Sequence, residues 1–91
     1  MFMKKDRIAH ADDRRSGYRF FFFSNEGDPR EPMHVHVRRG SDEAKFWLVP
    51  EVAVAESFGF NAAELNALVR MVREERSRIE RAWNGYFGHG G

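Results

Sequence analysis

The chain contains no cysteine, which excludes disulfide bonds, thiolate zinc sites and cysteine nucleophiles. It has no apolar run near the roughly 20 residues that span a bilayer, and its charged N-terminus lacks the apolar segment of a secretory signal peptide. Neither sign of charge dominates, since 15 basic and 14 acidic residues give a net charge of +1 without a polybasic segment. These absences predict a cytoplasmic protein with no membrane association. The even charge gives only weak support for nucleic-acid binding.

Aromatic side chains are abundant by contrast, above all in the phenylalanine run at residues 20–23. A strand sends alternate side chains to opposite faces, so a strand at this run would be aromatic on both. The 91 residues make one small domain with a thin core, and little else in it looks able to cover two faces. The run therefore predicts either a strand with an unusual role or a strand whose second aromatic face is covered by a partner.

Hydropathy divides the chain into an arm and a domain. Residues 1–16 are polar and aperiodic, which predicts a flexible, charged N-terminal arm. Residues 17–88 form the predicted single domain. Its strands are expected at residues 18–24, 34–38 and 43–49, where β-forming residues lie between turn residues. A short fourth strand is expected at residues 52–56, with a helix as the alternative there.

A long helix is predicted after these strands. Asn61 and Glu64 have the spacing of a capping box, and Phe60 and Leu65 have that of a hydrophobic staple. Apolar residues follow at near-helical spacing as far as Tyr86, over roughly 24 residues. We therefore predict an α+β domain in which a three- to four-stranded antiparallel sheet carries one long C-terminal α-helix on one face.

The second and third predicted strands define a pairing register. A two-residue turn at Gly40 and Ser41 pairs residues 34–39 with 42–47. One face then collects the mostly aliphatic set Val35, Val37, Ala44, Phe46 and Leu48, which should receive the helix. The other face collects His34, His36, Arg38, Glu43, Lys45 and Trp47. A slip of one residue would mix the two sets, so the pattern itself specifies the register.

This second, ionisable face is the candidate site. Phe21, Phe23 and Trp47 would lie on or beside it, and with Arg38 and Glu43 they form a predicted surface for a protein partner. The alternative is a plain solvated face with one cross-strand ion pair.

Two chemical interpretations of the same face also remain open. His34 and His36 are candidate catalytic residues, acting as general acid and base of a ribonuclease-like or other phosphoryl-transfer enzyme. Lys45 or Arg38 would then hold the phosphate. The spacing His34-x-His36 also suits the start of a metal-binding module, but two histidines fall short of the usual ligand count. We therefore predict no metal and no cofactor, and leave open whether the protein is an enzyme.

Several motifs resemble those of a small prokaryotic family, the domain of unknown function numbered 4160. They are the segments 17–27, 32–37, 43–48 and 59–61, followed by the helix end at 82–87. The resemblance covers about residues 17–88, and the chain departs from the family pattern at Met33 and Val49. It implies a short cytoplasmic bacterial protein, often encoded beside another small protein in arrangements that look like toxin–antitoxin modules. It implies no reaction and no catalytic residues.

From these observations an interaction module of such a two-gene system is the first hypothesis. Its partner would be the neighbouring gene product or a second copy of the chain. The phosphoryl-transfer enzyme and the metal-binding module are the alternatives.

Overall fold

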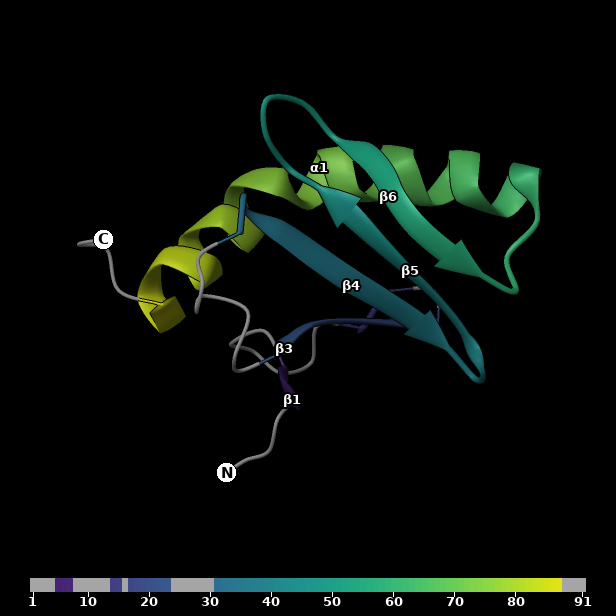
Figure 1. Ribbon diagram of the computed structural model, residues 1–91, viewed down its shortest axis with the longest axis horizontal. Coiled ribbons are helices and arrows are strands. Elements are labelled where there is room, and N and C mark those ends of the chain that lie inside the picture. Colours follow the sequence, from purple (N-terminus) through teal and green to yellow (C-terminus); the bar gives the residue numbers. More distant parts are fainter. Residues whose placement is uncertain (1–4, 8–13, 16, 24–30, 88–91) are drawn as a thin grey trace.

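The computed structural model describes residues 5–7, 14–15, 17–23 and 31–87. Its strands are β1 (Lys5–Arg7), β2 (Arg14–Arg15), β3 (Tyr18–Phe23), β4 (His34–Arg39), β5 (Asp42–Trp47) and β6 (Ala53–Phe58), followed by α1 (Ala62–Phe87). The strands form an antiparallel sheet in the order β1-β3-β4-β5-β6, and β2 also pairs with β3. Figure 1 shows α1 lying across one face of this sheet, with its C-terminal part turned at an angle. The predicted α+β class and antiparallel sheet are confirmed.

Two short strands lie in the segment that was predicted as a flexible arm. β1 pairs with β3 from Phe21 to Phe23, and β2 pairs with Arg19 and Tyr18. Strands of three and two residues are too short to leave a hydropathy period, which explains why the sequence pattern missed them. The rest of residues 1–16, and most of the loop predicted at 25–32, lie outside the described residues.

The predicted hairpin register is confirmed in full. All six expected pairs between β4 and β5 are present, from His34 opposite Trp47 to Arg39 opposite Asp42. Gly40 has a φ of 62°, in the left-handed region that a glycine reaches without the steric cost of a side chain. A backbone bond of 3.0 Å from Leu48 N to Met33 O extends the pairing beyond the strands.

The fourth predicted region is a strand, and it extends further than expected. β6 runs to Phe58, and it pairs Glu56 with Lys45 but Val54 with Phe46. Ala55 is therefore a β-bulge, an extra residue in one strand that has no partner in the other. The bulge places Glu56 on the same face as Lys45 while Val54 shares the face of Phe46.

The helix begins as the capping pattern predicts. Asn61 N donates to Glu64 Oε1 at 2.9 Å, and Glu64 N donates to Asn61 Oδ1 at 2.8 Å. Phe60, just before the cap, is buried, and its ring lies 6.0 Å from that of Tyr18. Each exchanged bond satisfies a backbone group that the first turn of a helix leaves without a partner.

The core lies between α1 and the aliphatic face of the sheet. All five residues predicted to receive the helix are at most 2% exposed. From β3 the ring of Phe22 meets Trp83 edge-on at 5.2 Å. The helix contributes Leu68, Val72, Ile79 and Trp83, whose spacing skips the charged pair at 75–76. There the side chains form local ion pairs instead, Glu75 with Arg78 and Arg76 with Glu80.

Candidate functional site

The ionisable face of the sheet, opposite α1, is divided into a covered part and an open part. Phe21, His34 and His36 are 4%, 0% and 6% exposed, so the chain itself buries them. Phe58, at the end of β6 on the same face, is 72% exposed. The expectation of one continuous uncovered aromatic face therefore does not hold at Phe21. The side chain of Phe23 lies outside the described part of the structure.

The covered part is a cluster of stacked and edge-on rings. Phe21 and His36 are opposite each other on β3 and β4, and their rings stack at 5.4 Å with an interplanar angle of 18°. The ring of His34 meets those of His36, Trp47 and Trp83 edge-on, at 5.4, 5.7 and 5.0 Å. These contacts explain how the imidazoles are shielded from water.

His34 occupies a structural position at the start of β4. Its Nδ1 donates to the carbonyl oxygen of Pro32 at 2.8 Å, which assigns the proton to that nitrogen. Trp83 of α1 contacts both His34 and Phe22, although register places these two residues on opposite faces. The helix therefore reaches the end of the sheet, an arrangement that strand periodicity alone cannot reveal.

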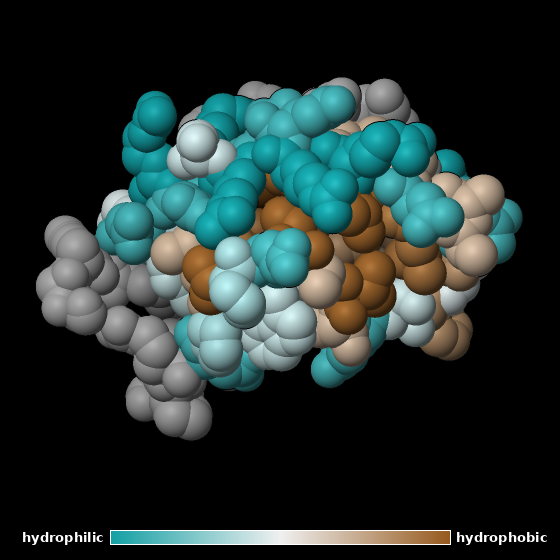
Figure 2. Space-filling view, turned by 90° about the horizontal axis from the view of Figure 1, so that it is seen from above, coloured by the Kyte–Doolittle hydropathy of each residue, from teal (hydrophilic) through white to brown (hydrophobic). Residues whose placement is uncertain are grey.

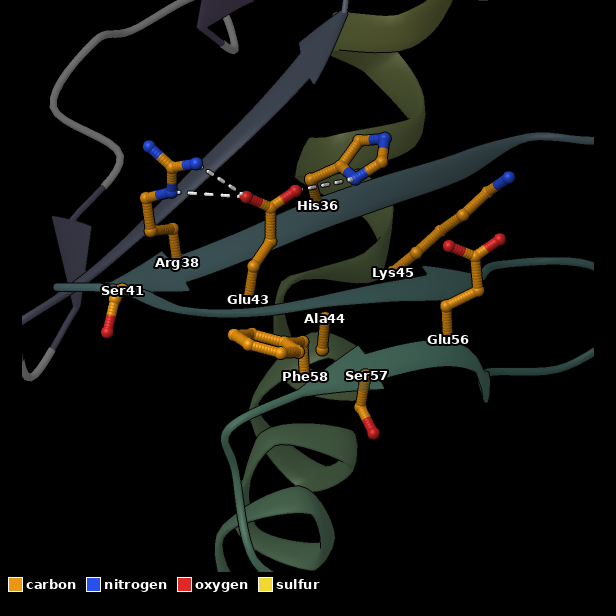
Figure 3. Close-up of a pocket in the computed structure, with 9 residues that line it drawn as sticks. All are labelled: His36, Arg38, Ser41, Glu43, Ala44, Lys45, Glu56, Ser57 and Phe58. Atoms are coloured by element: carbon orange, nitrogen blue, oxygen red, sulfur yellow. Dashed lines mark hydrogen bonds and ion pairs between the residues drawn. The ribbon is translucent and has the colours of Figure 1, made fainter.

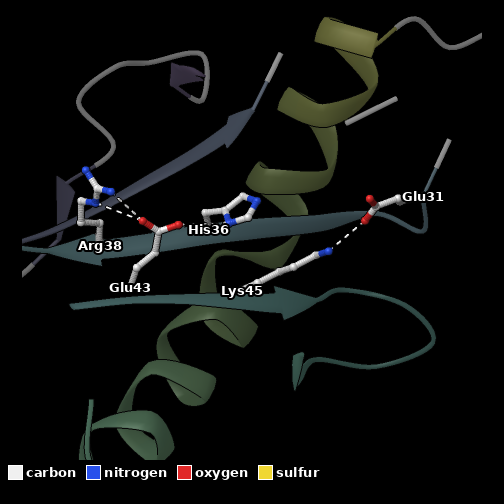
Figure 4. A network of polar contacts seen from close by, with 5 residues as sticks. All are labelled: Glu31, His36, Arg38, Glu43 and Lys45. Atoms are coloured by element: carbon white, nitrogen blue, oxygen red, sulfur yellow. Dashed lines mark hydrogen bonds and ion pairs between the residues drawn. The ribbon is translucent and has the colours of Figure 1, made fainter. Parts of the chain in front are cut away.

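Arg38 and Lys45 on this face each pair with a carboxylate, as Figure 4 shows. Arg38 donates from Nε (3.1 Å) and Nη2 (2.8 Å) to the same Oε1 of Glu43. The other oxygen, Oε2, lies 3.6 Å from His36 Nδ1. Lys45 Nζ donates to Glu31 Oε1 at 2.9 Å and lies 4.7 Å from the centre of the Trp47 ring. A phosphate bound here would have to compete with both carboxylates.

A groove of about 410 Å³ opens on this face across β4, β5 and β6. Its lining combines the predicted site residues His36, Arg38, Glu43 and Lys45 with Ser41, Ala44, Glu56, Ser57 and Phe58. Figure 3 shows the ring of Phe58 lying below the Arg38–Glu43 pair, with Lys45 and Glu56 at the other end of the group. The groove therefore has an apolar end beside charged groups of both signs.

Sequence reasoning missed the contribution of β6 to this site. Phe58 lies two residues beyond the predicted end of the fourth strand at residue 56. The signal that could have found it is the alternation of Glu56 and Phe58, which extends the strand period beyond the predicted end.

The candidate site lies within the part of the chain that matches a known protein family. Residues 17–84, which include β3 to β6 and most of α1, match the family described as Domain of unknown function (DUF4160). The chain belongs to the DUF4160 family. No curated protein and no solved structure matches it. No helix in the described part of this DUF4160 protein is long and apolar enough to cross a bilayer.

The DUF4160 chain offers little support for a metal centre in its described part. Within residues 5–7, 14–15, 17–23 and 31–87 no three histidine, aspartate or glutamate side chains are grouped so that they could hold an ion. The His34 and His36 rings lie close together, but the nearest carboxylates, Glu31 and Glu43, approach different histidines at 3.9 and 3.6 Å.

A second polar cluster of the DUF4160 fold joins the sheet to the start of α1. Arg39 donates to Tyr18 OH at 3.0 Å and to Glu64 Oε2 at 2.6 Å, and its guanidinium lies 5.0 Å from the centre of the Tyr18 ring. The bond to Glu64 raises the pKa of Arg39 above its usual value. The pKa of Glu64 is lowered, first by the backbone N–H of Asn61 and then by Arg39. This cluster fixes the helix start relative to β3 and β4.

Proposed function

We propose that this DUF4160 chain is a protein-interaction module, and that its partner is the second protein of a two-gene, toxin–antitoxin-like system. The module binds through the open part of the ionisable face, where Phe58 and the Arg38–Glu43 pair border the groove. The family resemblance supports the choice of partner and a cytoplasmic, bacterial setting.

The exposure of Phe58 carries this proposal. Among the side chains whose exposure the structure describes, which exclude those of Phe23, Tyr86 and Phe87, the large hydrophobic ones exposed to solvent are Phe58 at 72% and Val54 at 39%, and both belong to β6. Solvent-exposed aromatic area beside a polar rim is typical of a protein–protein contact, because burial of the ring gains free energy only when a partner covers it.

The polar lining of the groove suits such a contact. Arg38 and Glu43 hold each other in place before a partner arrives, so little side-chain entropy is lost when they are covered. Of the residues predicted for the partner surface, Arg38 and Glu43 are retained, and Phe58 takes the place of the buried Phe21.

The catalytic alternative receives less support from this geometry. A general acid or base must approach its substrate within hydrogen-bond distance, and His34 is fully buried. His36 borders the groove, but the two candidate phosphate-binding cations already contact carboxylates.

Co-expression of the chain with the protein encoded by the neighbouring reading frame tests the proposal. Light scattering during gel filtration should show a complex that contains both proteins in a fixed stoichiometry, with a mass larger than that of either protein alone. The matched control is each protein alone at the same concentration. A DUF4160 chain that elutes unchanged in the presence of its neighbour would refute the proposed partner.

A further inference from the structure

Within the part of the chain that the structure describes, β6 is an edge strand of the sheet. The strand order ends at β6, which pairs with β5 on one side, and Figure 1 shows it at the outer border. Every residue of β6 except the half-buried Ala55 is exposed. Such an edge presents backbone N–H and C=O groups to which another extended chain can bind.

The two faces of β6 differ in chemistry. Val54 shares the face that packs on α1, whereas Glu56 and Phe58 share the ionisable face. Figure 2 looks down on the side where β6 and α1 lie uppermost in Figure 1, and it shows a hydrophobic area bordered by hydrophilic residues. A strand added here would need apolar side chains towards this area and polar ones towards Glu56.

We infer that β6 accepts an extended segment of the partner protein as an additional strand, and that this segment alternates apolar with basic residues. The inference rests on the proposed function and specifies how the partner binds. Backbone hydrogen bonds along the edge would supply affinity, while the groove and the apolar area would select the alternating side chains. A basic residue beside Glu56 would complement its charge, and an aliphatic residue would cover Val54.

A second copy of the chain suits this edge less well. Glu56 lies in the middle part of β6, so antiparallel pairing of two β6 strands would bring two Glu56 carboxylates close together. Like charges across a strand pair are destabilising. The central Glu56 charge therefore disfavours pairing of two copies of this edge, whereas a partner segment with basic residues would complement it.

Amide hydrogen exchange of the full chain tests the inference. The probe is a capped ten-residue peptide of alternating lysine and valine. At about ten times its dissociation constant, exchange of outward-facing amides in residues 53–58 should slow by about tenfold, whereas fast-exchanging amides outside β6 should not change. The same peptide methylated on alternate backbone nitrogens should give no slowing, because it cannot donate the required bonds.

Charge variants test the chemistry of the segment. Glu56→Gln should weaken binding of the lysine–valine peptide by about threefold and remove its preference over a glutamate–valine peptide. Glu51→Gln, at an exposed position outside β6, is the matched control and should bind as the unchanged chain does.

Three results would overturn the inference: no slowing in residues 53–58, equal slowing by the methylated peptide, or a dimer of the chain alone with these amides already protected. The outcome is separable from that of the proposed function. A complex with the neighbouring protein that leaves β6 unprotected, together with no peptide effect, refutes strand addition alone. Peptide-induced protection without any such complex refutes the proposed partner alone.

Discussion

Replacing Phe58 with serine should weaken partner binding without weakening the fold. At 72% exposure, a phenylalanine side chain of roughly 200 Å² leaves about 140 Å² in contact with water. Burial at about 25 cal/mol per Å² sets an upper limit near 3.5 kcal/mol. Association converts only part of this into affinity, so we expect a loss of about 2 kcal/mol, or roughly thirtyfold in Kd.

Titration calorimetry with the neighbouring protein measures that change, and thermal melting checks the fold. The stability of Phe58→Ser should stay within about 0.5 kcal/mol of the unchanged chain, because the ring makes few buried contacts. Ser77→Ala, at an exposed position on α1, is the control; it should leave the affinity unchanged and should not lower the stability. Unchanged affinity of Phe58→Ser would refute the reasoning, since it would show that the partner does not cover this ring.

Three further predictions concern the fold that holds the site. Asn61→Ala should cost about 1 kcal/mol and lower the Tm by about 5 °C, because a helix-start N–H loses its acceptor, whereas Asn61→Asp should not. Gly59→Ala should lower the Tm because φ is +93° and the added methyl would overlap Asp42, whereas Gly85→Ala, with open space in the helix, should raise it. An effect of the same sign at both glycines would contradict this account. Because the pKa of Glu64 is lowered on folding, its ionised form stabilises the fold above its usual pKa of 4.5, and this stability is lost as the pH falls through the lowered pKa. Denaturation curves measured at several pH values should therefore show a smaller loss of stability below about pH 4.5 for Glu64→Gln than for the unchanged chain.

The hairpin and the helix start could be predicted from the sequence because each has a local cause. Alternation in the two strands leaves a single register that separates Val35 and Val37 from the histidines, and Gly40 supplies the turn. The bonds between Asn61 and Glu64 follow from a spacing of three residues. Neither result depends on parts of the chain that are distant in sequence.

The burial of the histidines could not be predicted, since it depends on distant elements. Trp83 reaches His34 only because α1 extends to the end of the sheet, and Phe21 covers His36 only because β3 pairs beside β4. The exposure of the open part of the ionisable face depends on which strand forms the edge of the sheet. Phe58 is exposed because no described strand follows beyond β6, which no local pattern shows.

The fully buried His34 also limits what a genetic screen can reveal. An alanine there would remove a ring that touches Trp47, Trp83 and His36 and that donates to the Pro32 carbonyl. Cells would then contain less folded protein, and any growth phenotype would disappear whatever the chemistry of the site. A loss-of-function allele at this position therefore measures protein abundance, whereas one at the exposed Phe58 measures recognition.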